Sequence, residues 1–276
     1  GLGDVYKRQR VESGFAESLP VYNLSSLMSG RDIFPMQTRF SLRRAVACTL
    51  VILFSCAASA EAERECVVLL HGLFRSSLAM KPLEWHLESQ GYTVVNQDYA
   101  SISYPIEELA EVAVGQGIDA CQAQGIFPIH FVTHSLGGLL VRQYAARHAI
   151  PESTRVVMLG PPNQGSQVAD YYGSFTFLGD LEPVAIDQLG TGEQSLARRL
   201  GPVEFQLGVI AGNVRSATFL PGFPDEPSDG TVTVAEAIVP GMLDFLQMPV
   251  VHTFMIWNPL VWSQAVHFLR DGQFQR

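Results

Sequence analysis

Apolar residues follow two alternating patterns from residue 66 to the C-terminus. Short, mostly apolar runs are typical of buried strands and lie at 66–72, 92–98, 128–133, 154–159, 205–212 and 246–251. Between them, apolar residues recur at helical spacing, as at 76–90, 106–122, 136–144 and 260–269. This alternation predicts a three-layer α/β domain, in which helices flank both faces of a mostly parallel sheet.

One strand-to-helix junction carries the most informative motif. Ser135 lies there, after the apolar run 128–133 and before a helical pattern. A serine at such a turn holds its hydroxyl clear of the sheet, and the turn closes only if the residues two before and two after it are small. Gly137 meets this demand, whereas Thr133 is β-branched and is expected to crowd the turn. The alternative is a serine that only caps the helix. The predicted nucleophile elbow comprises Thr133, His134, Gly137 and Gly138 around the serine.

Two backbone amides near this serine are candidates for an oxyanion hole. The first predicted strand ends in His71-Gly72, and the loop after such a strand supplies one N–H donor. We assign that donor to Leu73 and the second to Leu136, directly after the candidate nucleophile. Each such donor contributes about 3 kcal/mol to lowering the barrier of acyl transfer. Taken alone, His71-Gly72 would be a strand-to-loop turn with a packed histidine.

A carboxylate follows in the expected place along the chain. Asp229 opens an Asp-Gly turn after the apolar run 205–212. Asp-Gly is common in surface turns, so the argument rests on order, because the acid follows the serine and precedes the histidine in enzymes with this elbow. Asp225 is the second candidate. Asp244 is disfavoured because it lies too close to the next predicted strand.

Two histidines, His252 and His267, follow Asp229. A catalytic base must lie on a loop from which it can face the nucleophile, and the last apolar run, 246–251, leads directly to His252. His267 falls inside the amphipathic helical pattern 260–269, where a histidine is more often a packed or surface group. We therefore assign the base to His252.

Five segments, in this order, resemble the α/β-hydrolase superfamily, specifically its bacterial lipase and esterase branch, with similarity also to the inositol-deacylase-like hydrolases. The matching segments are 67–73, 133–138, 160–166, 228–232 and 252–255. Together they span the chain from about residue 66 to residue 274. The resemblance implies an α/β-hydrolase fold and a serine hydrolase that cleaves carboxylic esters of small molecules or lipids.

The resemblance also implies how these residues act. His252 would take the proton of Ser135 as it attacks an ester carbonyl, Asp229 would fix the imidazole tautomer, and water would clear the acyl-enzyme. No metal and no cofactor are required, and the histidines without a role lack the spacing of metal ligands. They are His86, His130 and His148. An amidase or acyltransferase with the same triad, and a noncatalytic binding protein of the same fold, are the alternatives.

A secretory signal is expected at 36–60. A basic stretch at 36–44 precedes 13 residues of apolar character at 45–57, and Ala58-Ser59-Ala60 offers a cleavage site of small residues. The apolar stretch is too short to span a bilayer. The alternative is a lipoprotein anchored at Cys56. Residues 1–35 precede the signal, and we expect them to be non-native or untranslated and to pack against nothing.

The expected mature chain, 61–276, forms a single domain exported to the periplasm or the medium, and we expect it to be a monomer. It keeps 11 of the 18 Lys and Arg and 23 of the 27 Asp and Glu, which leaves a net charge of −12. This charge disfavours nucleic acids and anionic membranes as partners, but it does not exclude neutral lipid. Cys66 and Cys121 are its only thiols. Both should lie near the noncatalytic edge of the sheet, either in a disulfide, as an oxidising compartment allows, or as separately buried thiols.

Regular patterning breaks down between residues 165 and 202. Aromatic and apolar residues stand among glycines there, at Tyr171, Tyr172, Phe175, Phe177 and Leu178, and a helical run follows at 194–200. An insertion above the strand ends commonly forms a lid or the wall of an acyl pocket, so we predict an aromatic-lined cap over Ser135. The alternative is a packed excursion without gating.

Overall fold

The structure is a computed structural model, and it describes residues 64–173, 184–214 and 226–276. The chain divides into two units, Gly1–Ser59 and Ala60–Arg276, and every described residue belongs to the second. The expectations for 1–35, for 36–60 and for Cys56 lie outside the described residues. Within the described ranges, no helix is long and apolar enough to cross a membrane.

Six strands form one parallel sheet in the described part of the chain. They are β1 (Cys66–Leu70), β2 (Thr93–Gln97), β3 (Ile129–His134), β4 (Arg155–Leu159), β5 (Gln206–Gly212) and β6 (Asp244–Met248). Their order is β2-β1-β3-β4-β5-β6, and every neighbouring pair is parallel. The predicted α/β architecture is confirmed, and the carboxyl ends of all these strands share one edge.

The last strand differs most from its predicted bounds. It occupies Asp244–Met248 instead of 246–251. Pro249 has no N–H to donate to a neighbouring strand, and the N–H of Val250 turns back to the carbonyl of Met248 at 2.8 Å. The ladder therefore stops at Met248, and the following turn delivers His252.

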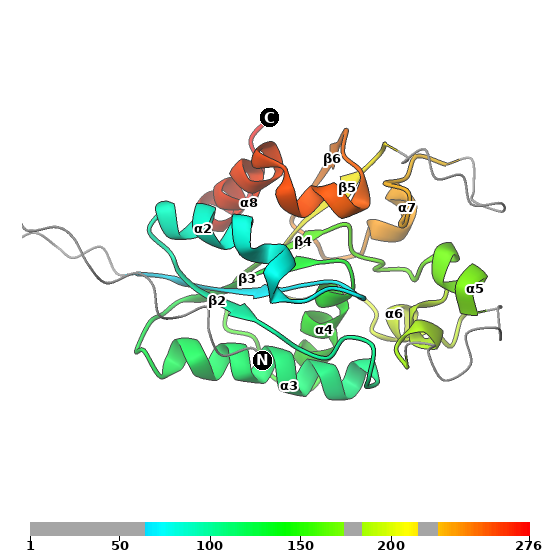
Figure 1. The fold of residues 1–276 in the computed structure, drawn as a ribbon, viewed down its shortest axis with the longest axis horizontal. Helices are drawn as coiled ribbons and strands as arrows, with labels where there is room; N and C mark the ends of the chain where they lie inside the picture. Colours follow the sequence, from blue (N-terminus) through cyan, green and yellow to red (C-terminus); the bar gives the residue numbers. More distant parts are fainter. Residues whose placement is uncertain (1–63, 174–183, 215–225) are drawn as a thin grey trace, which may run out of the picture. The chain divides into compact units, whose positions relative to one another are not determined.

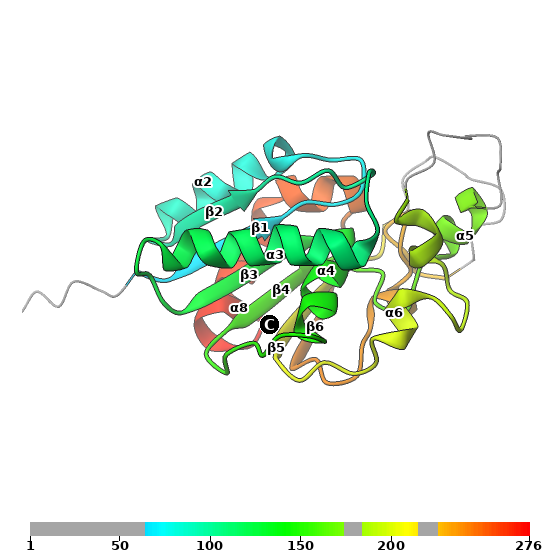
Figure 2. The same ribbon diagram turned by 90° about the horizontal axis from the view of Figure 1, so that it is seen from below.

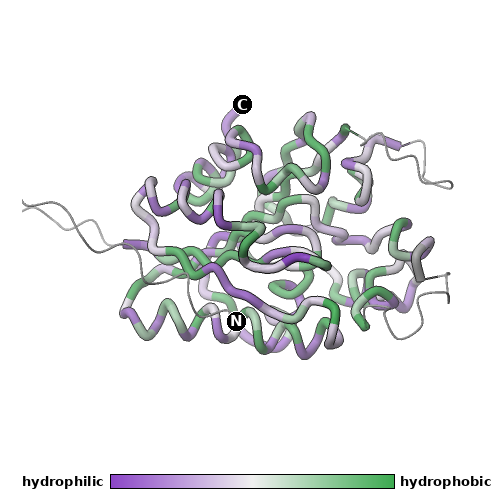
Figure 3. Tube along the Cα trace, viewed as in Figure 1, coloured by the Kyte–Doolittle hydropathy of each residue, from purple (hydrophilic) through white to green (hydrophobic). Residues whose placement is uncertain are grey.

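Helices cover both faces of the sheet (Figures 1 and 2). Helices α3 (Ile106–Gln122) and α4 (Leu136–Ala145) pack on one face, and α2 (Lys81–Ser89) and α8 (Pro259–Asp271) on the other. In β1, Cys66, Val68 and Leu70 belong to the first core, whereas Val67 and Leu69 belong to the second. Because successive side chains of a strand alternate between faces, a strand buried on both sides is apolar throughout. Figure 3 shows hydrophobic residues along the central strands, whereas hydrophobic and hydrophilic residues alternate along α3.

The described part of the segment 165–202 contains α5 (Gln167–Gly173), the 3-10 turn η3 (Ile186–Leu189) and α6 (Leu196–Arg199). These elements lie beyond the carboxyl ends of the strands (Figure 1). Phe175, Phe177 and Leu178, on which the prediction of an aromatic lining depended, lie outside the described residues. The described cap side chains that reach the pocket at Ser135 are aliphatic or small, at Val168, Ala169, Ile186 and Leu189, together with Ser166.

Arg142 of α4 fastens part of this cap to the core. Its guanidinium is buried and donates to the carbonyl oxygens of Asn163 at 2.8 Å, Ala197 at 3.0 Å and Gly201 at 2.7 Å. Burial lowers the pKa of Arg142 to about 10. The charged group keeps its proton at neutral pH, and charge-assisted hydrogen bonds offset its desolvation. The part of the cap around α6 is therefore a wall held against α4.

Cys66 and Cys121 form a disulfide, with their Cα atoms 6.0 Å apart. Cys66 opens β1 and Cys121 lies in the last turn of α3, so the bond ties the amino end of a central strand to the helix that covers it. Both residues are fully buried. The bond is far from the carboxyl edge of the sheet, where Ser135 lies.

Replacing both cysteines with alanine is expected to lower the free energy of unfolding by about 2–4 kcal/mol, because the bond closes a loop with a sequence separation of 55 residues. Urea unfolding of the C66A/C121A variant and of the oxidised wild type measures the difference. Thiol titration of the unfolded wild type serves as the control for oxidation. Equal unfolding midpoints in the two proteins would contradict the expectation.

Candidate active site

Ser135 occupies a strained turn between β3 and α4. Its φ is 53° and its ψ is −120°, a conformation that non-glycine residues rarely adopt. The N–H of Ser135 donates to the carbonyl of Leu159 at 2.9 Å, which fixes the turn to the neighbouring strand. A Cβ at Gly137 would lie 2.7 Å from the Leu70 carbonyl oxygen. The motif therefore requires a small residue at this position because a larger one would collide with the end of β1.

Thr133 does not crowd this turn as expected. It lies within β3, where it pairs with Leu70 on one side and Met158 on the other. A β-branched residue suits that environment. The side chain is fully buried, and its hydroxyl has no hydrogen-bond partner among the described residues. The chain therefore turns at Ser135, whose backbone has a positive φ, and not at Thr133.

Asp229 and His252 form a buried hydrogen-bonded pair. The Nδ1 atom of His252 lies 2.7 Å from Oδ2 of Asp229, and the backbone N–H of His252 donates to the Asp229 carbonyl at 2.9 Å. The other carboxylate oxygen, Oδ1, accepts hydrogen bonds from the amides of Thr231 at 2.9 Å and Val232 at 2.7 Å. With Nδ1 as the donor to a carboxylate, Nε2 carries the lone pair of a neutral imidazole.

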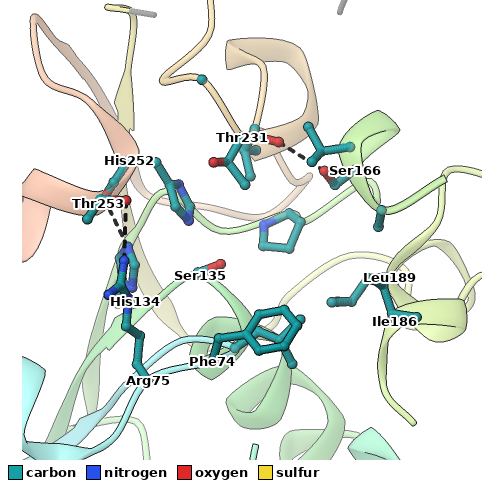
Figure 4. A pocket seen from close by; sticks show the side chains of 16 residues that line it. Phe74, Arg75, His134, Ser135, Ser166, Ile186, Leu189, Thr231, His252 and Thr253 are labelled. Carbon is teal, nitrogen blue, oxygen red and sulfur yellow. Dashed lines mark hydrogen bonds between the residues drawn. The ribbon is translucent and has the colours of Figure 1, made fainter. Parts of the chain in front are cut away.

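The His252 ring and the Ser135 side chain face the same pocket (Figure 4). No hydrogen bond joins these two described side chains in the structure. Such contacts commonly tighten only when a substrate binds. Thus the structure brings together the three residues that the sequence motifs singled out. The serine comes from the β3–α4 turn, the acid from the loop after β5, and the base from the start of the 3-10 helix η4 (His252–Trp257), which follows β6.

The two candidate oxyanion donors flank the serine. Leu136 is the first residue of α4, where a backbone N–H has no acceptor within the helix. Leu73 lines the pocket and belongs to a tight turn, closed by a hydrogen bond from the Arg75 N–H to the Gly72 carbonyl at 3.3 Å. A Cβ at Gly72 would lie 3.1 Å from the Cβ of Ser135, so the turn passes close beside the serine and leaves little room for a side chain there.

His71 is packed beneath this turn. Its ring is fully buried and stacks on Tyr99 with a centroid distance of 4.0 Å, and the Tyr99 hydroxyl donates to the carbonyl of His71. Burial lowers the pKa of His71. This neutral histidine supports the backbone that leads to Leu73 and does not reach the pocket lining.

The other candidates lie elsewhere. His267 is on α8, where its Nδ1 atom lies 2.9 Å from the Gln273 carbonyl oxygen. Asp244 opens β6, accepts a hydrogen bond from the Phe274 N–H at 2.7 Å and pairs with Arg276. Asp225 lies outside the described residues. Neither His267 nor Asp244 contributes to the pocket at Ser135.

This pocket has a volume of about 560 Å³, within the range of sites for small organic ligands. Its wall is mostly apolar, with Leu73, Pro162, Val168, Ile186, Leu189 and Val232 among the lining residues. Phe74 stands at the pocket and is 63% exposed. The nucleophile candidate is therefore presented to a space suited to hydrocarbon.

Gly160 has a role that sequence reasoning missed. It follows β4 directly, has a φ of +56°, and a Cβ there would lie 2.9 Å from Oδ2 of Asp229 and 3.0 Å from Nδ1 of His252. These two atoms share the central hydrogen bond of the pair. The one available signal was its position at the carboxyl end of a strand, since parallel strands end at the same edge of a sheet.

Gly160→Ala is expected to lower kcat by about 10- to 100-fold, because the methyl group displaces the imidazole from the carboxylate. Gly125→Ala is the matched control, since Gly125 has a φ of +68° but open space around its Cβ position. Steady-state ester hydrolysis by both variants measures the difference. An equal loss of kcat in the two would attribute the effect to backbone strain alone.

A parallel sheet that presents a serine turn beside an Asp–His pair is the arrangement of the α/β hydrolases. The sequence profile of the alpha/beta hydrolase family matches residues 67–267. The chain belongs to this family, and its class is that of a hydrolase. The superfamily assignment from the sequence motifs is confirmed.

Solved structures of lipases and esterases share the fold. Lipase BlEst2 of Bacillus licheniformis in its mature form has a TM-score of 0.56 at 21% identity, over 76% of this chain and 93% of that one. An esterase of Pyrococcus furiosus has a TM-score of 0.53 at 15% identity, over 76% and 82%. Phospholipase PlaB of Legionella pneumophila has a TM-score of 0.52 at 20% identity, over 63% of this chain but only 45% of that one. The sequence matches none of the curated proteins with which it was compared.

Proposed function

We propose that this hydrolase cleaves carboxylic esters of small molecules or lipids through an acyl-enzyme on Ser135. The observation that carries the proposal is the buried pair of Asp229 and His252, joined at 2.7 Å, of which His252 lines the same pocket as the strained serine. A serine hydroxyl is a weak nucleophile until a nearby base accepts its proton. The tautomer fixed by Asp229 leaves Nε2 of His252 free to accept that proton.

The reaction follows from these roles. As Ser135 Oγ attacks the ester carbonyl, its proton passes to Nε2 of His252, and the carboxylate of Asp229 stabilises the imidazolium. The amides of Leu73 and Leu136 would hold the negative oxygen of the tetrahedral intermediate. The imidazolium then protonates the departing alcohol. Water, deprotonated by His252, attacks the acyl-enzyme and releases the acid.

The mostly apolar wall of the pocket supports an acyl group of hydrocarbon character, because burying apolar surface contributes about 25 cal/mol per Å². Carboxylic esters with uncharged acyl chains fit that wall better than charged substrates, whose desolvation would be uncompensated. This argument addresses the acyl side of the substrate only.

A fluorophosphonate probe tests the proposal, since such reagents phosphonylate a serine only where a base activates it. We expect stoichiometric labelling, with the adduct on Ser135 by mass spectrometry. A panel of nitrophenyl esters from acetyl to palmitoyl then measures the preferred acyl length through kcat/KM. An unlabelled Ser135 would overturn the proposal. Labelling together with hydrolysis of amides but not esters would identify an amidase.

We also propose that the domain is exported. The Cys66–Cys121 disulfide supports this, because such bonds persist mainly in oxidising compartments. Fractionation of cells that express the chain from Met36 tests the proposal, with export expected to remove the segment up to Ala60. Full-length protein that stays in the cytoplasmic fraction would contradict it.

A further inference from the structure

His134 lies between the turn at Gly72, which leads to the candidate oxyanion donor Leu73, and the segment that holds the candidate base His252. It is the last residue of β3, directly before Ser135, and its side chain is 2% exposed. Its Nε2 atom lies 3.1 Å from the backbone carbonyl oxygen of His252, and the two imidazole rings have a centroid distance of 4.7 Å. In Figure 4 the side chain points toward the segment of His252 and Thr253.

The other side of the same ring meets the turn before Leu73. A Cβ at Gly72 would lie 2.9 Å from Nδ1 of His134 and 3.5 Å from its Cε1. The ring therefore fills the space between Gly72 and the backbone of His252. The ring thus lies against both the candidate oxyanion turn and the backbone of the candidate base.

One hydrogen bond fixes the tautomer of the His134 ring, and burial favours its neutral form. A carbonyl oxygen only accepts, so Nε2 carries the hydrogen and donates to His252. Nδ1 is buried and has no hydrogen-bond partner among the described residues. Burial, followed by the repulsion that a protonated His252 would exert, holds the pKa of His134 well below its usual value. The residue is thus a neutral, single-donor imidazole.

A buried nitrogen without a hydrogen-bond partner costs free energy of desolvation. A leucine or phenylalanine would fill the space without that cost. The donor at Nε2 is what an apolar residue could not supply, and its acceptor is the backbone of the candidate base. The chemistry of the ring therefore points to placement of His252 and not to stability of the core.

We propose that His134 is a positioning residue that sets the place of the His252 backbone, and with it the imidazole, relative to Ser135 and the turn at Gly72. The inference rests on the proposed function of Ser135 and His252. It predicts that the Nε2 donor matters for turnover and much less for substrate binding. A shift of about 1 Å in a catalytic group can cost about 100-fold in rate.

Two amides of different length separate this role from simple packing. In His134→Gln, the terminal amide reaches the place of Nε2 and can donate to the His252 carbonyl, whereas the shorter amide of His134→Asn cannot. Both variants bury a neutral polar group. His130→Gln and His130→Asn are the matched controls, because His130 is buried in the same strand but contacts Glu65 and the Arg155 N–H, away from the pocket.

The measurements are kcat and KM for a nitrophenyl ester, the rate constant of fluorophosphonate labelling, and Tm. We expect His134→Asn to lower kcat and the labelling rate by about 10- to 100-fold, with KM changed by less than about twofold. His134→Gln should keep most of the wild-type kcat and labelling rate. Both His130 variants should keep the wild-type kcat even if their Tm is lower.

The outcomes distinguish the two proposals. If the wild type is not labelled at Ser135, the proposed function fails. If the wild type is labelled but His134→Asn reacts at the wild-type rate, the positioning role is wrong. The positioning role is also wrong if His134→Gln and His134→Asn lose the same amount of kcat. It is wrong as well if the His130 variants lose as much kcat as His134→Asn, together with a lower Tm.

Discussion

Replacing His252 with alanine is expected to lower kcat for ester hydrolysis by about 10⁴- to 10⁶-fold, because members of such a triad act as a unit and the loss of its base removes nearly all of the triad's contribution. The imidazole is held at 2.7 Å from Oδ2 of Asp229 on the wall of the pocket that contains Ser135. Without it, the Asp229–His252 pair that would take the proton of the serine is lost. KM should change little, since the imidazole acts mainly in the transition state.

His267→Ala is the matched control. This histidine also follows Asp229 in the chain, but it lies on α8, and its Nδ1 atom contacts the Gln273 carbonyl oxygen at 2.9 Å. Wild-type kcat is expected for this variant. Steady-state kinetics on both proteins, with far-ultraviolet circular dichroism to verify folding, makes the comparison. Activity that survives in His252→Ala but is lost in His267→Ala would show that the base was assigned to the wrong residue.

The order of strands and helices along the chain could be predicted because a strand that is buried on both faces forms a continuous apolar run in the sequence. The continuous apolar run of β1 supplies both cores, and runs of this kind recur with helical patterns between them. The end of β6 was not predictable in this way. It depends on Pro249, which lacks a backbone donor, and on the turn from Val250 to Met248, whereas the apolar residues continue past both.

Ser135, Asp229 and His252 could be grouped from the sequence because their arrangement follows chain order and each lies in a segment that follows a predicted strand. Contacts made across the sheet leave no such pattern. Gly160 is needed because Asp229 and His252 meet over its backbone, and Nε2 of His134 has its acceptor 118 residues further along the chain. A sequence shows which residues are present, but these roles arise only when distant strand ends come together.

Thr133 illustrates the reverse case, in which a sequence rule was applied to the wrong environment. The rule asks for small residues around the serine because side chains there can collide with neighbouring backbone. Gly137 obeys it against Leu70, but Thr133 still belongs to the β3 ladder between β1 and β4. The conformational cost falls on Ser135, whose φ is positive, so a β-branched residue two positions earlier is compatible with the turn.

Asp229→Asn is expected to lower kcat by about 10³- to 10⁴-fold while the protein stays folded; the corresponding change in a serine protease costs about 10⁴-fold. The amide is nearly isosteric, and its oxygen can still accept the hydrogen bonds that Oδ1 receives from Thr231 and Val232. Its NH₂ group would then face Nδ1 of His252, which must become the acceptor. The imidazole would carry its hydrogen on Nε2, where it could no longer take the proton of Ser135.

Asp244→Asn provides the matched control, because Asp244 also accepts a backbone amide, from Phe274 at 2.7 Å, and pairs with Arg276 at the other end of the domain. Its loss should lower stability by about 1–3 kcal/mol at most and leave kcat unchanged. The two variants therefore separate the loss of a hydrogen-bonded carboxylate from the loss of the correct tautomer. If Asp229→Asn kept kcat within about tenfold of the wild type, the carboxylate would not set the tautomer of the base, and the acid would have to be sought elsewhere, with Asp225 next in line.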